Sequence, residues 1–202
     1  MKNNRHSRKR IEGILISICL LFIFLTGCNH NTDYTQTTLQ LEKDGTIIQT
    51  IVEEFQDSSY DFEELKQMNQ EETKAYNESV SHEAIETTMM QYEGDKVKAV
   101  ITYMNVNDYY GFNNTILYFG TIEQAKIAGY NLNVNLVSVD GQDKISPDEL
   151  KDMEKRHIAI VNEAVDVHTY GKILYTSEDV TVGKNKKLAT VAGEETAYIV
   201  FK

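Results

Sequence analysis

Alternation of apolar and polar residues near the start of the globular region predicts a β-hairpin. Leu39 and Leu41 alternate with polar residues, Asp44-Gly45 supplies the positive φ of a tight turn, and residues 46–55 are rich in β-branched side chains. The register of this hairpin stays open, because Ile47 and Ile48 are adjacent and either could face the core. Residues 84–92 and 97–103 flank the turn sequence Glu93-Gly94-Asp95-Lys96 and predict a second hairpin.

Helical spacing replaces this alternation in three or four stretches. Asp61, with Glu64 three positions later, resembles a capping box and precedes apolar residues at helical spacing over residues 62–79. A short helix is predicted at 106–114. Another follows the pair Thr121 and Gln124 and ends near Gly129, and a last one opens at 146–149 with proline at its first position.

The remaining apolar stretches read as strands, and the sequence contains no regular βαβ alternation. Hairpins interrupted by blocks of helix predict an α+β fold with a mainly antiparallel β-sheet and about three to four helices packed on one face. Two small α+β halves divided near Tyr130 are the alternative. The further predicted strands are residues 115–119, 133–139, 158–162, 165–170, 172–175 and 196–201, with turns at 140–141 and 183–186.

The first 27 residues have the pattern of an export signal. Basic residues precede an apolar stretch over 14–25, which as a helix rises roughly 18 Å and so falls short of the roughly 30 Å hydrocarbon core. We therefore expect a cleaved signal and not a membrane-spanning helix.

The apolar stretch ends in Leu25-Thr26-Gly27-Cys28, which resembles the lipobox of bacterial lipoproteins. The resemblance implies diacylglyceryl attachment to the Cys28 sulfur and cleavage between Gly27 and Cys28. Acyl chains such as palmitate would hold the chain to the outer face of the cell membrane, since two chains anchor almost permanently. An ordinary secretory signal with a coincidental cysteine is the alternative.

Charge and cysteine content change once the signal is removed. Five of 20 basic and one of 31 acidic residues lie in the first 27, so the remainder carries a net charge of about −15. Such a charge argues against nucleic acid as a partner. Cys19 lies in the signal and Cys28 would carry lipid, so we expect no disulfide. We expect a polar tether at 28–36 and a single globular domain at 37–202.

No residue pattern predicts catalysis, a metal site or a cofactor. After the predicted signal, Ser81-His82 is the one adjacent serine and histidine, and neighbours in sequence rarely align for proton transfer. The turn at 140–143 offers two carboxylates for calcium but lacks an EF-hand pattern. Adjacent acids such as Glu53-Glu54 diverge on either a strand or a helix, and no glycine-rich loop suggests phosphate binding.

An aromatic cluster near residue 110 is the candidate surface for a ligand or partner. Tyr109, Tyr110, Phe112 and Asn113 combine rigid apolar faces with hydrogen-bonding groups. A short helix that packs Tyr109 and Phe112 onto a sheet would produce the same pattern.

Three parts of the chain resemble small uncharacterised lipoproteins of clostridial-type Gram-positive bacteria: Ile51-Val52-Glu53-Glu54-Phe55, Phe112-Asn113-Asn114 with Leu117-Tyr118-Phe119-Gly120-Thr121, and Gly171-Lys172-Ile173-Leu174-Tyr175. The resemblance spans nearly all of the mature chain and implies no catalytic or binding residues.

These observations favour a non-catalytic envelope-associated lipoprotein that binds an envelope protein or a small ligand. Two alternatives stay open: a cell-wall or polymer-degrading hydrolase that uses dispersed carboxylates, and a small solute-binding lipoprotein of a transporter.

Overall fold

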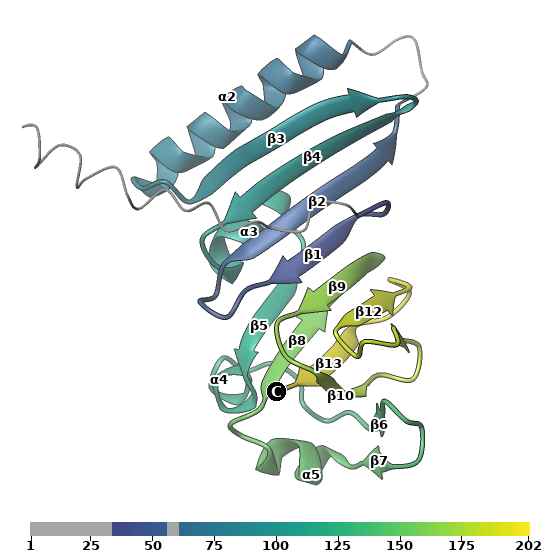
Figure 1. The fold of residues 1–202 in the computed structure, drawn as a ribbon. Coiled ribbons are helices and arrows are strands. Elements are labelled where there is room, and N and C mark those ends of the chain that lie inside the picture. The colour runs from purple at the N-terminus through teal and green to yellow at the C-terminus, as the bar shows by residue number, and fades with distance from the viewer. Residues whose placement is uncertain (1–33, 56–60) are drawn as a thin grey trace, which may run out of the picture. The chain divides into compact units, whose positions relative to one another are not determined.

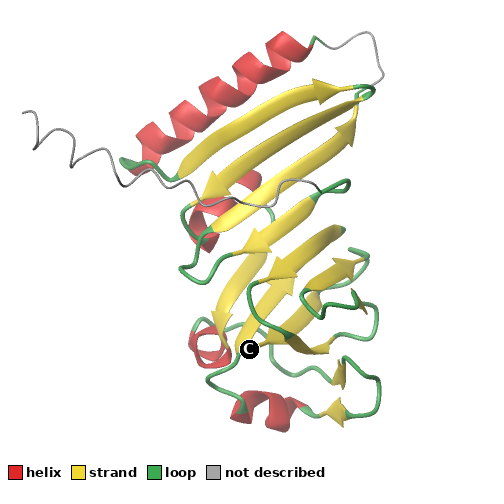
Figure 2. Cartoon of the chain, in the orientation of Figure 1, coloured by secondary structure: helices red, strands yellow, loops and turns green. Residues whose placement is uncertain are grey.

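The computed structural model describes residues 34–55 and 61–202, and the strands of these residues form two sheets (Figures 1 and 2). The pairings are antiparallel except that β1 runs parallel to β9. The first sheet contains, in spatial order, β11 (Thr181–Val182), β12 (Leu188–Val191), β9 (Val165–Thr169), β1 (Thr38–Leu41), β2 (Ile47–Glu54), β4 (Lys96–Tyr103) and β3 (Ile85–Glu93). The second contains β5 (Leu117–Thr121), β8 (His157–Val161), β13 (Ala197–Phe201), β10 (Ile173–Thr176), β6 (Leu136–Ser138) and β7 (Lys144–Ile145).

Within the described residues four helices accompany these sheets, so the predicted α+β fold is confirmed. Figure 1 shows α2 lying along β3, whereas α4 and α5 lie beside the second sheet. The helices are α2 (Phe62–Val80), α3 (Val106–Asn113), α4 (Ile122–Ile127) and α5 (Pro147–Asp152).

Two predicted hairpins form with the expected turns. β1 pairs with β2 across a turn in which Gly45 has φ +97°. The neighbours Ile47 and Ile48 are both buried, and Ile47 is the one that joins the core between the sheets. β3 pairs with β4 across Gly94, and a bulge interrupts their register between Thr87 and Met89.

Alternation along the second sheet places apolar residues on both of its faces. In β8, Ala159 and Val161 join a core shared with the first sheet, whereas Ile158 and Ile160 join a second core. That second core is closed by Ile122 of α4 and Leu150 of α5. A strand that is buried on both faces therefore reads as an unbroken apolar run.

Capping residues fix the starts of the short helices. Thr121 and Gln124 exchange side-chain and backbone hydrogen bonds at the start of α4, and Ser146 and Glu149 do the same before Pro147 of α5. Both helices begin where the sequence predicted.

The separation into two sheets was not predicted. Each sheet takes strands from both sides of Tyr130, since β9 and β12 complete the first sheet and β5 enters the second. The strands β7, β11 and β12 also lay outside the predicted elements.

Candidate functional site

Helix α2 lies against β3, the last strand of the first sheet, and three side chains on one face of the helix attach it. Phe62 packs on Tyr92 with ring centroids 6.0 Å apart, and Asn69 Oδ1 accepts a hydrogen bond from the Thr87 hydroxyl at 2.8 Å. Asn77 contacts the start of the strand. Positions 62, 69 and 77 share a face because they are separated by about two helical turns each.

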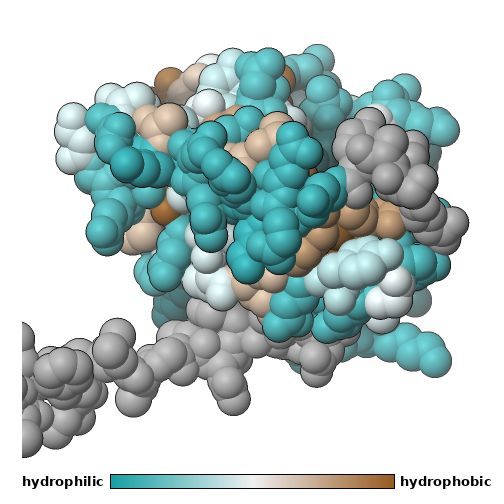
Figure 3. All heavy atoms as spheres, turned by 90° about the horizontal axis from the view of Figure 1, so that it is seen from above, coloured by the Kyte–Doolittle hydropathy of each residue, from teal (hydrophilic) through white to brown (hydrophobic). Residues whose placement is uncertain are grey.

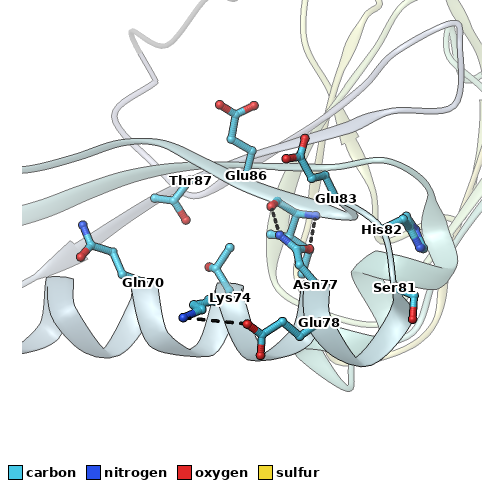
Figure 4. A pocket seen from close by; sticks show the side chains of 11 residues that line it. Gln70, Lys74, Asn77, Glu78, Ser81, His82, Glu83, Glu86 and Thr87 are labelled. Carbon is cyan, nitrogen blue, oxygen red and sulfur yellow. Dashed lines mark hydrogen bonds and ion pairs between the residues drawn. The ribbon is translucent and has the colours of Figure 1, made fainter.

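Asn77 binds β3 through the strand's backbone. Its Oδ1 accepts from the Ala84 and Ile85 N–H groups at 3.0 and 2.9 Å, and its Nδ2 donates to the Ile85 carbonyl at 2.8 Å (Figure 4). The side chain thus takes the place of a neighbouring strand at this one residue.

Next to this contact, a groove of about 590 Å³ opens between α2 and β3 (Figure 4). The helix contributes side chains one turn apart, and the strand contributes its first residues. The lining residues of α2 include Gln70, Thr73, Lys74, Asn77 and Glu78, and those from the following turn and β3 include Glu83, Ile85, Glu86 and Thr87.

Negative charge predominates in this groove. Glu78, Glu83 and Glu86 line it together with one ammonium group, that of Lys74. Lys74 Nζ lies 3.8 Å from Glu78, and both side chains are largely exposed, so the pair contributes little to stability. Glu83 and Glu86 form no ion pair with a described residue.

The wider surface around α2 is also hydrophilic. Seen from the side that carries α2, the molecule shows mostly polar side chains with a narrow band of apolar atoms between them (Figure 3). Within the groove, the Thr73 hydroxyl oxygen is buried and has no hydrogen-bond partner in the described part of the chain. Such an oxygen is rare in folded proteins.

His82 lies beside the groove, and both of its ring nitrogens face groups other than Ser81. Nδ1 lies 2.9 Å from the Val80 carbonyl, and Nε2 lies 3.8 Å from Oδ1 of the buried Asp108. Figure 4 shows the Ser81 side chain pointing away from the His82 ring. His82 is therefore not placed to act as a base on the Ser81 hydroxyl.

The aromatic candidates of α3 do not share one surface. Tyr109 is fully buried and donates its hydroxyl to Glu163 Oε1 at 2.6 Å. Phe112 packs edge-on against Tyr76, and Asn113 Nδ2 donates to the Tyr109 carbonyl. Tyr110 alone among these candidates is largely exposed, at 52%. Tyr109, Phe112 and Asn113 pack α3 onto the sheets, and a partner role for Tyr110 stays a prediction.

Glu163 is a partly buried carboxyl group with a perturbed pKa. Burial raises its pKa above the ordinary value, and the hydrogen bond from Tyr109 opposes that rise. Burial also raises the pKa of the Tyr109 hydroxyl, as does the neighbouring Glu163 charge. The hydrogen-bond partner of Glu163 is thus a tyrosine, whereas glycoside hydrolysis uses two carboxyl groups across the scissile bond.

In the turn at 140–143, the carboxylate of Asp140 forms hydrogen bonds within the turn itself. Asp140 Oδ1 accepts from the Ser138 hydroxyl at 2.6 Å and from the Gln142 N–H at 3.3 Å, and these bonds lower the pKa of Asp140. Within residues 34–55 and 61–202, no three His, Cys, Asp or Glu side chains lie together in a way that could hold a metal ion.

Gly27 and Cys28 lie outside the described residues, as does all of the predicted signal. None of the helices that the structure describes combines the length and apolar character needed to cross a membrane. Comparisons with known protein families, curated proteins and solved structures found no match.

The groove between α2 and β3 could not be predicted from the sequence. Its residues are common on solvent-exposed helices, and their proximity depends on how α2 docks on β3. The available signals were the asparagines at 69 and 77 on the face of α2 that carries Phe62, where apolar residues would be expected.

Proposed function

We propose that this chain is a lipoprotein, attached to the outer face of the cell membrane through Cys28, that binds a partner protein of the cell envelope in the groove between α2 and β3. The support for attachment is the Leu25-Thr26-Gly27-Cys28 sequence after an apolar stretch. The support for binding is the groove itself, where the first residues of the edge strand β3 lie beside a polar helix face.

In the described part of the first sheet, β3 has β4 on one side and the helix α2 on the other. Asn77 already binds the outward N–H and C=O groups of Ile85. The groove therefore offers a partner mainly the polar side chains of α2 and of the first residues of β3.

Photo-crosslinking in the bacterium that makes the protein tests this proposal. A photoreactive amino acid at Gln70, which is exposed on the groove side of α2, is expected to capture a discrete envelope protein. The same amino acid at Lys155, exposed in the turn between α5 and β8, is the matched control and should not capture it. Identical products from both positions, or none from Gln70, would contradict the proposal.

A further inference from the structure

We infer that a cluster of lysines at one end of the two sheets contacts anionic phospholipid head groups of the membrane that anchors the chain; this inference rests on the proposed attachment through Cys28. Three segments meet at this end through their backbones. The Lys202 N–H donates to the Lys172 carbonyl at 3.1 Å, and the Ile173 N–H donates to the Lys186 carbonyl at 2.7 Å. The five lysines that these segments bring together, called the lysine patch, are Lys172, Lys184, Lys186, Lys187 and Lys202.

The lysine patch stands out in an otherwise acidic chain. Twenty basic residues less the five in the predicted signal leave 15, and five of these lie in the patch. Four of the five are exposed, and none forms an ion pair with a described residue. A carboxylate lies nearby, because the charge of Lys186 adds to the hydrogen bonds that lower the pKa of Asp140. The patch still has an excess of positive charge, which an anionic surface attracts.

The start of the described chain lies beside the lysine patch. Tyr34 packs on His168 of β9, with ring centroids 6.3 Å apart, and His168 pairs with Leu188 at the start of β12. Burial lowers the pKa of His168, the charge of Lys187 lowers it further, and the charge of Glu42 opposes both effects. Lys187 is therefore close to the side chain on which Tyr34 packs.

The length of chain before Tyr34 limits how far this end of the sheets can lie from the lipid. Cys28 precedes Tyr34 by six residues. Six residues in any conformation span at most about 21 Å. Lysines near an anionic bilayer are attracted to it over about one Debye length, roughly 8 Å at physiological salt. An anchor on Cys28 would therefore keep the lysine patch close enough to reach the head groups.

The acidic part of the molecule lies at the other edge of the first sheet. Three strands, β1, β2 and β4, separate β9 from β3, along which α2 lies (Figure 1). Helix α2 carries five glutamates and two lysines, and β3 adds two glutamates. An anionic bilayer would attract the lysine patch and repel α2, and both effects favour the same orientation. The groove between α2 and β3 would then face away from the membrane, toward a partner.

Fluorescence quenching in vesicles tests the inference with the lipidated chain. A fluorophore is attached at Asn185→Cys, in the loop of the lysine patch, or at Glu194→Cys, in the loop before β13. The second position precedes the start of β13, whereas Lys202 follows its end, so Glu194→Cys is the matched control. With Cys28 lipidated, the added cysteine is the one free thiol of the mature chain.

The vesicles contain phosphatidylcholine with or without phosphatidylglycerol, and a lipid that is spin-labelled at its head group serves as the quencher. We expect phosphatidylglycerol to increase quenching at Asn185→Cys several-fold and to leave quenching at Glu194→Cys unchanged, because the anionic surface attracts only the lysine patch. High salt should abolish the increase, since it screens the attraction.

Two variants that carry the label at Asn185→Cys locate the contact. Replacing Lys184, Lys186 and Lys187 by glutamine should lower the equilibrium constant for contact about a hundredfold, since each lysine near an anionic surface contributes roughly fivefold. Arginine at the same three positions should keep the contact, because it retains the positive charge.

A matched control removes the same amount of charge from another part of the molecule. Lys66 and Lys74 of α2 and Lys98 of β4 are replaced by glutamine, and quenching should stay unchanged. Equal loss in both glutamine variants, or quenching at Asn185→Cys that does not depend on phosphatidylglycerol, would overturn the inference.

Two further outcomes identify what has failed. Binding of soluble poly(glycerol phosphate) to the lysine patch, with no contact in anionic vesicles, would reject the membrane and identify an anionic polymer as the occupant. Mass spectrometry of the N-terminal peptide tests the anchor separately. Absence of lipid would reject the proposed attachment itself, whereas lipid without charge-dependent contact would reject only the role of the lysine patch.

Discussion

Glu163 illustrates how a single residue couples the core to pH. Its raised pKa means that its ionised form is less favourable in the folded than in the unfolded chain. The associated stability is therefore fully present below the ordinary carboxyl pKa of 4.5 and is lost as the pH rises through the folded-state value.

Replacing Glu163 by Gln should remove this dependence while keeping an oxygen that accepts from the Tyr109 hydroxyl. We expect the variant to be more stable than the parent protein near pH 7, and the difference to shrink toward zero near pH 4. Urea unfolding midpoints at a series of pH values measure it. A variant that is less stable than the parent protein by the same amount at both pH values would contradict this prediction.

Gly171 lies where the backbone of the C-terminal residue approaches closely. A Cβ at this position would overlap the Lys202 carbonyl oxygen, far inside van der Waals contact. Gly171→Ala should therefore destabilise the fold by about 1–3 kcal/mol. Gly183→Ala is the control, because its Cβ would make ordinary contact with Leu188. Thermal unfolding of both variants measures the difference, and equal melting temperatures would contradict the prediction.

Residues with local roles were predictable from the sequence, whereas residues with distant partners were not. Thr121 and Ser146 bond to groups three positions away, so their spacing alone identified them. Ile47 and Ile48 could not be distinguished, because both turn out to be buried. Tyr109 was a candidate because of its aromatic ring, but its hydrogen-bond partner Glu163 lies 54 positions away and could not be predicted.

At the scale of elements, the contact between α2 and β3 depends strongly on Asn77. Asn77→Ala would leave the Ile85 N–H and carbonyl without their partner, at a cost of about 1–3 kcal/mol, whereas the Ala84 N–H keeps its bond to the His82 carbonyl. Amide exchange at Ala84 and Ile85 should also become faster. The stability of Asn77→Asp should lie between those of the parent protein and Asn77→Ala, since the carboxylate still accepts both N–H bonds but cannot donate to the Ile85 carbonyl.

A control for this effect is Gln67→Ala on the exposed part of the same helix. Gln67 bonds the Glu71 side chain one turn away, and its loss should change stability by less than about 0.5 kcal/mol. Equal losses in the Gln67 and Asn77 variants would show that helix propensity, and not docking on β3, determines the outcome.

Sequence patterns located most elements but not their neighbours. The periodicity of residues 62–79 predicted α2 almost to its ends, since local spacing defines a helix. Strands of two residues, such as β7 and β11, are too short to show alternation. Predicting the groove would require knowing that β3 is the last strand of its sheet, and hydrophobic spacing does not indicate the order of the strands.

At the scale of the whole molecule, the proposed localisation depends on Cys28. Cys28→Ala should abolish the proposed lipid attachment and the cleavage that would follow it, because the thiol is the group that would be alkylated. Metabolic labelling with an alkyne fatty acid, together with the mass of the N-terminal peptide, measures both steps. A variant that is still labelled and cut after Gly27 would refute the proposed anchor.

The pairing of β1 with β9 bears on when the chain acquires its fold. Thr38 of β1 pairs with Asp166 of β9. In the second sheet, β5 pairs with β8, and β8 pairs in turn with β13 near the end of the chain. Neither sheet can be completed before the last third of the chain is present, and proteins with such long-range strand pairing fold slowly. A chain exported N-terminus first would therefore stay extended through most of its passage across the membrane and complete both sheets only on the far side.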